Sequence, residues 1–491
     1  MGQLRLETCD VLPPWACDSA QSTPSAGSLD ADARLVRCRG MVQDVGPTQY
    51  LRGAGDEAWL EQTPVVLVPV PGEGERERSL VDRGRQTETA ANGHALTNGA
   101  SAASRALSEV VACFPGADDW VRSLNDIVEV VGVLSSPTAE LDEHATETDG
   151  LMDVWARLPC IHVRHWRVCV RHGTHAKWNA PVDAGENDED ASPSTDAYAF
   201  LVHKALAPML PQNDPLLAHY LLLTLLSSSA SPPASRCSLH LSLPPSTPRT
   251  VARHTAHWLT QGLQALAPRC VALEVSVTAL NAREWTPRKD YGTNRLERAP
   301  LQLPRGTLVV LDETTLEENG GQLNEVGVRN VRALLELVRD QTVRYQYDYT
   351  SGVRVEVDIP LILITCGRGL LASSQNALSV ADVRLPLPPL SPDQALDVPV
   401  DARCRAVLAH LQRAPWPRID DAMAQHIERD YVQERRDHPD ICEPGTLQRW
   451  LRLASLEARA HREEALTLER WSRMRAREAA RLERVRDERG G

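Results

Sequence analysis

The apolar residues of the chain follow two patterns, which divide it near residue 200. In the first part, short strand-like runs alternate with polar, turn-rich stretches. These runs cover residues 34–44, 63–73, 110–115, 126–136 and 160–170. Short strands separated by turn residues are typical of a small β-barrel. The sequence therefore predicts an OB-like β domain, formed by residues 34–73 and 107–179.

Three stretches beside these strands have few apolar residues. Residues 1–33 are polar and turn-rich, and we expect a poorly ordered N-terminus there. Residues 74–106 predict a disordered insert that splits the β domain, because so few apolar side chains cannot offset the entropy of ordering. Residues 180–196 contain acidic, proline and serine residues, and they predict an acidic linker.

From residue 197 onward, continuous apolar runs alternate with helical segments. The runs at 237–243, 271–279, 307–311 and 360–365 predict strands, and the segments 215–228, 250–266 and 323–341 predict helices. This alternation is typical of a parallel sheet covered on both faces. Residues 343–357 alternate around a Thr-Ser-Gly turn and predict a β-hairpin. We therefore predict an α/β domain over 197–401 and a helical C-terminal region over 402–491.

Composition excludes several classes of protein. The net charge of −13 disfavours broad binding to duplex DNA, which requires a basic surface. The eleven cysteines form no CxxC pair, so we expect neither a cysteine-rich zinc ribbon nor a disulfide framework. No apolar run approaches the roughly 18 residues of a membrane-spanning helix. We expect a reduced, intracellular protein without a membrane segment.

The acidic pair Asp312-Glu313 ends the predicted strand at 307–311, as it would in an ATPase that holds a magnesium-bound nucleotide. Such an enzyme also needs a glycine-rich phosphate loop with a lysine after its first strand. The corresponding stretch, 243–250, reads LPPSTPRT, and its three prolines offer no N–H groups to a phosphate. None of the three lysines of the chain follows a glycine. We therefore predict that both carboxylates cap the strand end and the following turn, and that the chain has no catalytic residues and no cofactor.

The order of these segments resembles the ATPase module of the MCM (mini-chromosome maintenance) replicative helicase. The segment 338–365 resembles the run that holds the pre-sensor hairpin and the sensor strand of that module, with Thr365 at the sensor-like end. The phosphate loop, the arginine-finger motif and the DNA-contacting lysine of the hairpin are missing. The resemblance implies a degenerate AAA+-like domain.

Longer runs are similar to the family of mini-chromosome maintenance complex-binding proteins. PRKDYGTNRL (287–296) and LQLPRGTLVVLDETTLEENGGQL (301–323) are the most specific, and LTLERW (466–471) adds to them. The similarity is patchy over 34–165, good over 200–370 and present again in the C-terminal helices. It implies a nuclear, non-catalytic partner of MCM subunits that regulates assembly, stability or chromatin unloading of the complex. DNA replication, sister-chromatid cohesion and the cell cycle, including cell division, would depend on it. Chromatin would be contacted indirectly, without sequence-specific nucleic-acid binding.

One polar motif is a candidate partner-recognition loop. It contains Lys289, Asp290, Tyr291, Asn294 and Arg295. The alternative is a loop that satisfies its own hydrogen bonds and packs over the sheet edge, because Asn and Asp readily do so in turns.

Two alternative functions stay open at this point. The first is an AAA-type nucleotide-dependent ATPase with an unorthodox phosphate loop. The second is an OB protein that binds single-stranded nucleic acid, although the acidic charge and only two phenylalanines disfavour it. A histidine-rich stretch, 161–175, could suggest zinc, but neighbouring strand residues face opposite sides, so we expect no metal site there.

Overall fold

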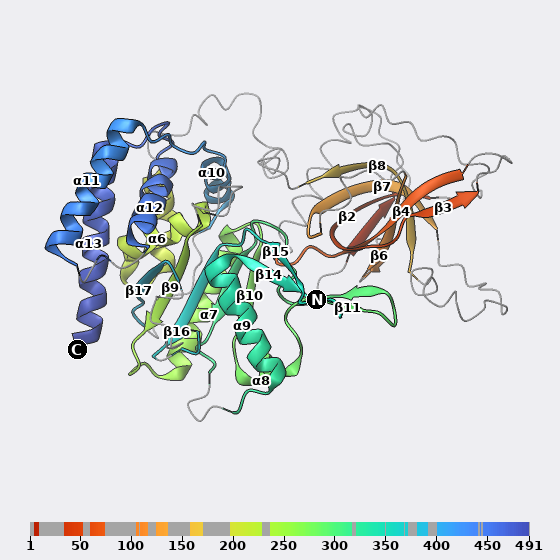
Figure 1. Cartoon of the computed structure of the whole chain (residues 1–491), viewed down its shortest axis with the longest axis horizontal. Coiled ribbons are helices and arrows are strands. Elements are labelled where there is room, and N and C mark those ends of the chain that lie inside the picture. Colours follow the sequence, from red (N-terminus) through yellow and green to blue (C-terminus); the bar gives the residue numbers. More distant parts are fainter. Residues whose placement is uncertain are drawn as a thin grey trace.

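The chain is described by a computed structural model over most of its length. The described residues are 4–8, 34–52, 59–73, 105–107, 109–115, 124–135, 158–169, 197–227, 236–316, 321–348, 350–367, 369–371, 381–390, 400–439, 442 and 445–490. Figure 1 shows an N-terminal β region at one end, an α/β region in the middle and long C-terminal helices at the other end. The predicted mixed architecture of barrel-like region, parallel sheet and C-terminal helices is confirmed.

Five N-terminal strands close into a barrel. They are β2 (Arg34–Val45), β4 (Trp59–Val68), β6 (Val110–Pro115), β7 (Ile127–Ser135) and β8 (Cys160–Val168). The strands pair around the ring β2-β4-β6-β8-β7 and back to β2, with β6 and β8 parallel and the other pairs antiparallel. Buried side chains such as Val65, Leu67 and Val130 fill the interior. Closure removes the open edges that a flat sheet of these strands would have.

Three shorter strands extend this sheet. They are β1 (Leu4–Thr8), β3 (Gln49–Arg52) and β5 (Arg105–Leu107). Strand β1 pairs with β2 and β5, so residues 4–8 depart from the prediction of a poorly ordered N-terminus. Residues 9–33, 74–104 and 180–196 lie outside the described residues, and the insert and linker proposed there stay predictions.

The α/β region is built on a five-stranded parallel sheet. Its strands are β9 (Ser238–Leu243), β10 (Cys270–Glu274), β13 (Leu308–Asp312), β16 (Leu361–Cys366) and β17 (Val383–Pro386). They lie in the order β10-β13-β16-β9-β17, and every neighbouring pair is parallel. The first strand, β9, is therefore central, between the fourth and the fifth. The inner strands β9, β13 and β16 are buried on both faces, which explains why they read as continuous apolar runs.

Helices cover the two faces of this sheet. They are α6 (Pro215–Leu226), α7 (Arg249–Leu266), α8 (Val277–Ala282) and α9 (Glu325–Asp340), preceded by the short turns α5 (Ala197–Phe200), η4 (Leu201–Leu206), η5 (Ala207–Met209) and η6 (Pro211–Asn213). The predicted strand 271–279 is wrong beyond Glu274. Ser276 caps α8 there, because its Oγ accepts a hydrogen bond from the N–H of Ala279.

Two hairpins project from the sheet. One joins β11 (Arg288–Asp290) to β12 (Arg295–Glu297), and the other joins β14 (Thr342–Tyr345) to β15 (Val353–Glu356). The hairpin predicted at 343–357 is confirmed, whereas the predicted loop 287–296 is itself a hairpin. The N–H of Lys289 donates to the carbonyl of Gln346, and the N–H of Gln346 donates to the carbonyl of Pro287. The two hairpins therefore lie side by side.

The C-terminal helices share one core with the parallel sheet. They are α10 (Ala402–Gln412), α11 (Asp421–Asp437), α12 (Thr446–Ala460) and α13 (Leu468–Gly490). Trp450 and Trp471 are buried in the same cluster as the apolar side chains of β9 and β16. Helix α13 also covers the edge strand β17, where Arg481 donates to the carbonyl of Arg384. Helices α10 to α13 are thus an integral layer of the α/β domain.

Candidate functional site

The carboxyl ends of β9, β13 and β16 meet at one edge of the sheet, where a nucleotide would bind in an ATPase of this layout. After β9 the chain makes a tight turn, in which the N–H of Thr247 donates to the carbonyl of Pro244. Cys366 packs against this turn, with its Sγ 3.6 Å from the carbonyl oxygen of Pro244. Gly367 lies against Pro245, and its N–H donates to the carbonyl of Leu243. The turn is therefore packed against β16, and its prolines offer no N–H groups.

Asp312 caps the turn that follows β13. Its Oδ1 accepts hydrogen bonds from the N–H of Thr314 at 2.9 Å and from the Oγ1 of Thr314 at 2.6 Å. This is a local side-chain-to-backbone contact of the kind that aspartate makes in turns. For Asp312 the predicted capping role agrees with the structure.

Glu313 is buried, with 3% of its surface exposed. Its Oε1 accepts a hydrogen bond from the N–H of Leu371 at 2.8 Å, which fastens the segment 369–371 over the end of the sheet. Gly369 lies so close that a Cβ there would overlap the other carboxyl oxygen, Oε2. Among the described residues, Oε2 has no hydrogen-bond partner. Burial raises the pKa of Glu313 to about 7, so the proton is partly retained at neutral pH.

Thr365, at the sensor-like end of β16, also makes an internal contact. It is fully buried, and its Oγ1 hydrogen-bonds His240 Nε2 at 2.8 Å. Burial lowers the pKa of His240 to about 4, so the imidazole is neutral near pH 7. The polar side chains of this edge that an ATPase would use are thus engaged with the protein itself, and the described residues lend no support to the ATPase alternative.

The motif predicted as a partner-recognition loop forms the β11–β12 hairpin, and its residues Lys289 and Arg295 face the barrel. Arg295 pairs with Glu109 at 2.6 Å. Lys289 Nζ lies 3.6 Å from Asp44 Oδ2 and donates a hydrogen bond to the carbonyl of Asn294 at 2.8 Å. Asn294 takes the left-handed conformation, with φ of 50°, which asparagine tolerates well. These residues hold the hairpin and the barrel together.

The tip of the hairpin is closed by local hydrogen bonds. Asp290 accepts from the N–H of Gly292 at 2.9 Å and from the Oγ1 of Thr293 at 2.7 Å, and these contacts lower its pKa. Tyr291 leaves 40% of its surface exposed. The structure therefore shows the internally bonded alternative for most of the motif, while partner recognition stays a prediction and rests on Tyr291.

Four buried polar residues at the junction of the barrel with the α/β domain were not found from the sequence. Gln43 donates to the carbonyl of Leu296 and accepts, through its own carbonyl, from Gln302 Nε2 at 2.9 Å. Asn125 and the hydroxyl of Tyr345 exchange hydrogen bonds of 2.8 and 3.1 Å. Each of the four side chains is at most 6% exposed. The only signal in the sequence was the polar Gln43-Asp44 pair, which follows Met41 and Val42 near the end of strand β2.

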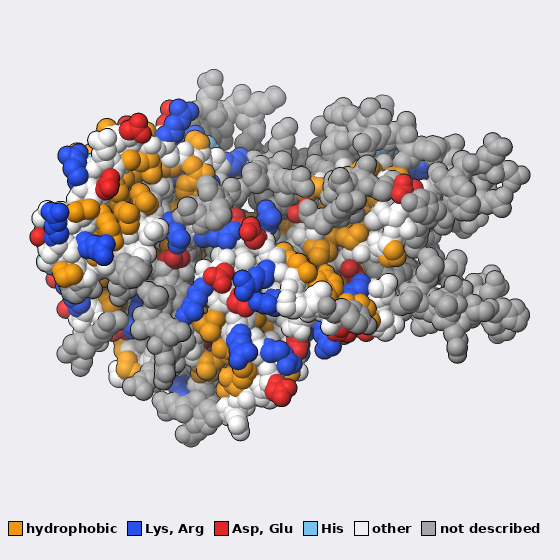
Figure 2. Space-filling model, in the orientation of Figure 1, with side chains coloured by type: hydrophobic (Ala, Val, Ile, Leu, Met, Phe, Trp, Pro, Cys, Tyr) orange, Lys and Arg blue, Asp and Glu red, His pale blue; other side chains and the backbone are white. Residues whose placement is uncertain are grey.

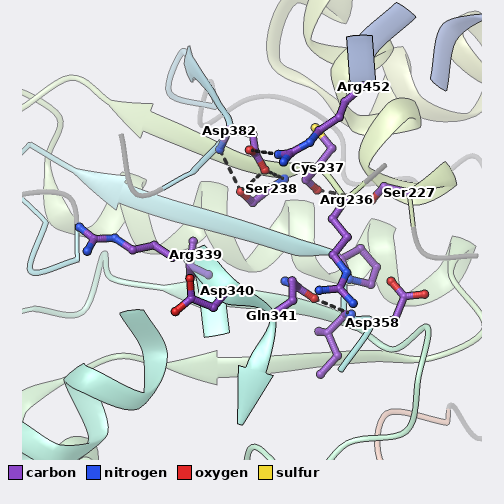
Figure 3. A pocket seen from close by; sticks show the side chains of 13 residues that line it. Ser227, Arg236, Cys237, Ser238, Arg339, Asp340, Gln341, Asp358, Asp382 and Arg452 are labelled. Atoms are coloured by element: carbon purple, nitrogen blue, oxygen red, sulfur yellow. Dashed lines mark hydrogen bonds and ion pairs between the residues drawn. The ribbon is translucent and has the colours of Figure 1, made fainter. Parts of the chain in front are cut away.

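A polar cavity of about 210 Å³ lies at the opposite, amino-terminal edge of the sheet. Figure 3 shows Arg452 directed at Asp382, to which it is bonded at 2.8 Å, and Arg339 directed away from the other labelled side chains. Asp382 also accepts from the N–H and the Oγ of Ser238. Burial raises the pKa of Asp358, on the cavity wall, to about 6. The charges of the Arg452–Asp382 pair compensate each other and join α12 to the sheet.

No group of three His, Cys, Asp or Glu side chains that could hold a metal ion occurs within the described ranges. His172 and His175 of the histidine-rich stretch lie outside those ranges. Of the helices that the structure describes, none is both long enough and apolar enough to cross a membrane.

Comparison with known proteins identifies similar chains. Residues 75–485 match the family model described as mini-chromosome maintenance replisome factor. Proteins named mini-chromosome maintenance complex-binding protein from Danio rerio, Gallus gallus and Arabidopsis thaliana are 29%, 30% and 28% identical over 405, 399 and 383 residues. These matches cover 75%, 74% and 74% of this chain and 61%, 60% and 60% of the relatives. The matched region thus spans about three fifths of the length of each relative.

Proposed function

Because the chain belongs to the mini-chromosome maintenance replisome factor family, we propose that it is a non-catalytic binding partner of MCM helicase subunits. Its relatives are named as proteins that bind the MCM complex. In this role the chain regulates the assembly, stability or chromatin unloading of that complex during DNA replication. Nuclear localisation and a contribution to sister-chromatid cohesion belong to the same proposal.

The observation that carries the proposal is a sheet arranged as in an ATPase module whose nucleotide edge is closed. The order β10-β13-β16-β9-β17 resembles that of AAA+ modules, and the closed barrel resembles an OB-fold. At the carboxyl edge, a turn with three prolines replaces the phosphate loop, and Glu313 fastens a covering segment. A scaffold of this kind, a degenerate AAA+-like domain, can present a subunit-like surface without completing an ATP site.

Subunit mimicry gives a physical route to regulation. If this chain binds a helicase subunit at the surface where a neighbouring subunit normally sits, it stabilises the separated subunit. The population of subunits then shifts away from the assembled complex, because a ligand favours the state that it binds. Excess chain should then withdraw subunits from assembled complexes. ATP at its own site is not required for this effect.

Nucleic acid is not needed for the proposed contact. The net charge is −13, and Figure 2 shows Lys and Arg side chains interspersed with Asp and Glu across the visible face. A duplex-binding surface would gather basic side chains on one face. Chromatin would be reached through the helicase subunits.

Capture of partners from cell extract tests the proposal. The tagged full-length chain is incubated with nuclease-treated extract of its own cells, and the captured proteins are identified by mass spectrometry. MCM subunits should be enriched over a tag-only control, and nuclease should not reduce their recovery. Absence of those subunits, or their loss on nuclease treatment, would contradict the proposal.

A variant at the closed edge separates binding from catalysis. The double substitution Asp312→Asn, Glu313→Gln should recover the same subunits as wild type, and neither protein should turn over ATP. Turnover by wild type that the double substitution abolishes would restore the ATPase alternative. The full chain is used because a cut between the two domains would expose the buried hydrogen bond between Asn125 and Tyr345.

A further inference from the structure

Two cysteines of the barrel wall lie beside each other. Cys113 belongs to β6, and Cys160 is the first residue of β8, 47 residues further along the chain. In the parallel pairing of these strands, Cys160 stands opposite Val111, two positions before Cys113. Both cysteines are therefore on the same face of the sheet, because side chains on one face recur at every second residue. Their Sγ atoms are 3.2 Å apart.

The pair lies on the outer face of the wall. Ala112 and Phe114, the neighbours of Cys113 in β6, belong to the core inside the barrel, whereas Cys113 belongs to a separate apolar cluster. Cys113 is 7% exposed, and Cys160 is half-buried beside it. Cys160 is thus the thiol that a small oxidant from solvent meets first.

The two sulfurs differ in how well they hold a negative charge. Cys160 accepts a hydrogen bond from the thiol of Cys113, which lowers the pKa of Cys160, and the hydroxyl of Ser135 acts in the same direction against the cost of burial. The same hydrogen bond and burial raise the pKa of Cys113. This direction of the hydrogen bond fits the surroundings, because Cys160 is the more exposed of the two. Since the thiolate is the nucleophilic form, Cys160 is the reactive member of the pair.

Only a small movement separates the two sulfurs from a bond. A disulfide has an S–S length of about 2.05 Å, so the atoms have to approach each other by about 1 Å. Cys160 stands at the end of its strand and follows Pro159, whose carbonyl accepts from the N–H of Val111 at 2.9 Å. A shift at this strand end disturbs the first bonds of the pairing and leaves the rest of β8 in place.

We propose that Cys113 and Cys160 form a peroxide-sensitive dithiol, which fastens β6 to β8 when it is oxidised to a disulfide. The inference does not require the proposed function, since it concerns the barrel alone. In the nuclear, reducing compartment proposed for this chain, such a disulfide would be transient and redox-sensing, because permanent disulfides are rare there.

The reaction has two steps and consumes one molecule of hydrogen peroxide. In the first, the Cys160 thiolate attacks a peroxide oxygen, the O–O bond breaks, and the leaving hydroxide takes a proton from solvent to become water. Cys160 is then a sulfenic acid, oxidised by two electrons. In the second, the sulfur of Cys113 attacks that of Cys160, and the S–S bond forms as the S–O bond breaks. The hydroxyl leaves as a second water with the thiol proton of Cys113.

The disulfide would act where the barrel is paired over the shortest length. Strands β6 and β8 share three register positions, whereas β2 and β7, like β7 and β8, share eight. Inside the barrel, the rings of Phe114 and Trp166 also join β6 to β8, with centroids 5.8 Å apart. A covalent bond on the outer face would restrain the other side of this pair and slow its opening.

Two other roles for the pair are disfavoured. A metal ion needs more than two sulfur ligands, and no third ligand joins these two within the part of the chain that the structure describes. Cys169 packs against the same apolar cluster and is the other cysteine that a reactive Cys160 could bond. The direct contact between Cys113 and Cys160 favours their mutual bond.

Peptide mass spectrometry of the full-length chain tests the reaction. The reduced chain is treated with hydrogen peroxide and digested without reductant. Wild type should give a disulfide between Cys113 and Cys160, which dithiothreitol reverses. Cys113→Ser should stop at a sulfenic acid on Cys160, which dimedone captures, and Cys160→Ser should keep Cys113 as a thiol. Cys442→Ser is the matched control, because Cys442 is half-buried in another part of the chain, and it should form the same disulfide as wild type.

Hydrogen exchange of the peptides that cover β6 and β8 tests the effect on the barrel. Both should exchange more slowly in oxidised wild type, and reduction should restore their rates. If circular dichroism shows that Cys113→Ser does not fold, Cys113→Ala replaces it. The reactive pair would be overturned by intact thiols in wild type, by a bond to Cys169 or to a second copy, or by a captured sulfenic acid on Cys113. Unchanged or faster exchange after oxidation would overturn the fastening of β6 to β8.

Discussion

Replacing Glu313 by glutamine changes how the stability of the chain depends on pH. The substitution keeps the size of the side chain and leaves an oxygen that can accept the hydrogen bond from Leu371. It removes the ionisable carboxyl, which the closed edge of the sheet holds with 3% of its surface exposed. Any effect on stability that varies with pH then reports the cost of ionising this group in the folded protein.

The size of the effect follows from the raised pKa. The pKa of Glu313 rises from 4.5 to about 7 in the folded chain, because burial disfavours the charged form. Between these two values the folded state binds more protons than the unfolded state, so the free energy of unfolding falls as pH rises. The penalty is absent below the unfolded pKa and complete above pH 7. A shift of this size corresponds to roughly 3 kcal/mol.

Urea unfolding between pH 4.5 and 8.5 measures this difference. Unfolding is followed by tryptophan fluorescence, to which Trp450 and Trp471, buried in the core shared with the sheet, contribute among the eleven tryptophans of the chain. As pH rises through this range, the free energy of unfolding of wild type should fall by roughly 3 kcal/mol relative to that of Glu313→Gln. The other titrating groups are the same in both proteins, so their contributions cancel in the comparison. If the free energies of unfolding of the two proteins changed with pH in parallel, the claim that Glu313 is buried and partly protonated would be refuted.

Three further substitutions or treatments have defined outcomes. Tyr345→Phe should lower the free energy of unfolding by about 1–3 kcal/mol in urea denaturation, because it leaves the buried amide of Asn125 without its partner; an unchanged midpoint would contradict the contact. Gly369→Ala should cost about 1–3 kcal/mol in the same assay, because its Cβ would overlap the buried glutamate carboxyl, and no loss would mean that the loop lies elsewhere. Mild hydrogen peroxide should join Cys113 and Cys160, whose Sγ atoms are 3.2 Å apart, with two water molecules released per disulfide formed; intact thiols in non-reducing peptide mass spectra would contradict this proximity.

Local patterns along the chain predicted much of the fold. The continuous apolar runs at β9, β13 and β16 identified the parallel sheet, because strands buried on both faces need no alternation. Alternation of apolar and polar residues around the Thr-Ser-Gly turn identified the β14–β15 hairpin, because strands with only one buried face alternate in this way. The same rule failed after Glu274, where valines continue but the Ser276 cap starts a helix. Capping by one side chain outweighed the β preference of the following residues.

Contacts between distant segments could not be predicted from the sequence. Asn125 and Tyr345 are 220 residues apart, and neither lies in a pattern that indicates a buried partner. Arg295 was predicted to lie in a partner-recognition loop or a self-bonded loop, and neither prediction indicated its ion pair with Glu109, which lies 186 residues away in the sequence. For the turn after β9, the sequence did predict three positions without an N–H group, because proline removes that group wherever it stands.

The equilibrium affinity of the full chain for a single purified MCM subunit, measured with and without ATP, tests the proposed function most directly. Calorimetry or fluorescence anisotropy in nuclease-treated samples would give this value. We expect specific binding with the same affinity in both conditions, since the carboxyl edge of the sheet is closed by the protein itself. Failure to bind any subunit would contradict the proposed partner, and an affinity that depends on ATP bound to this chain would contradict the closed, non-catalytic edge.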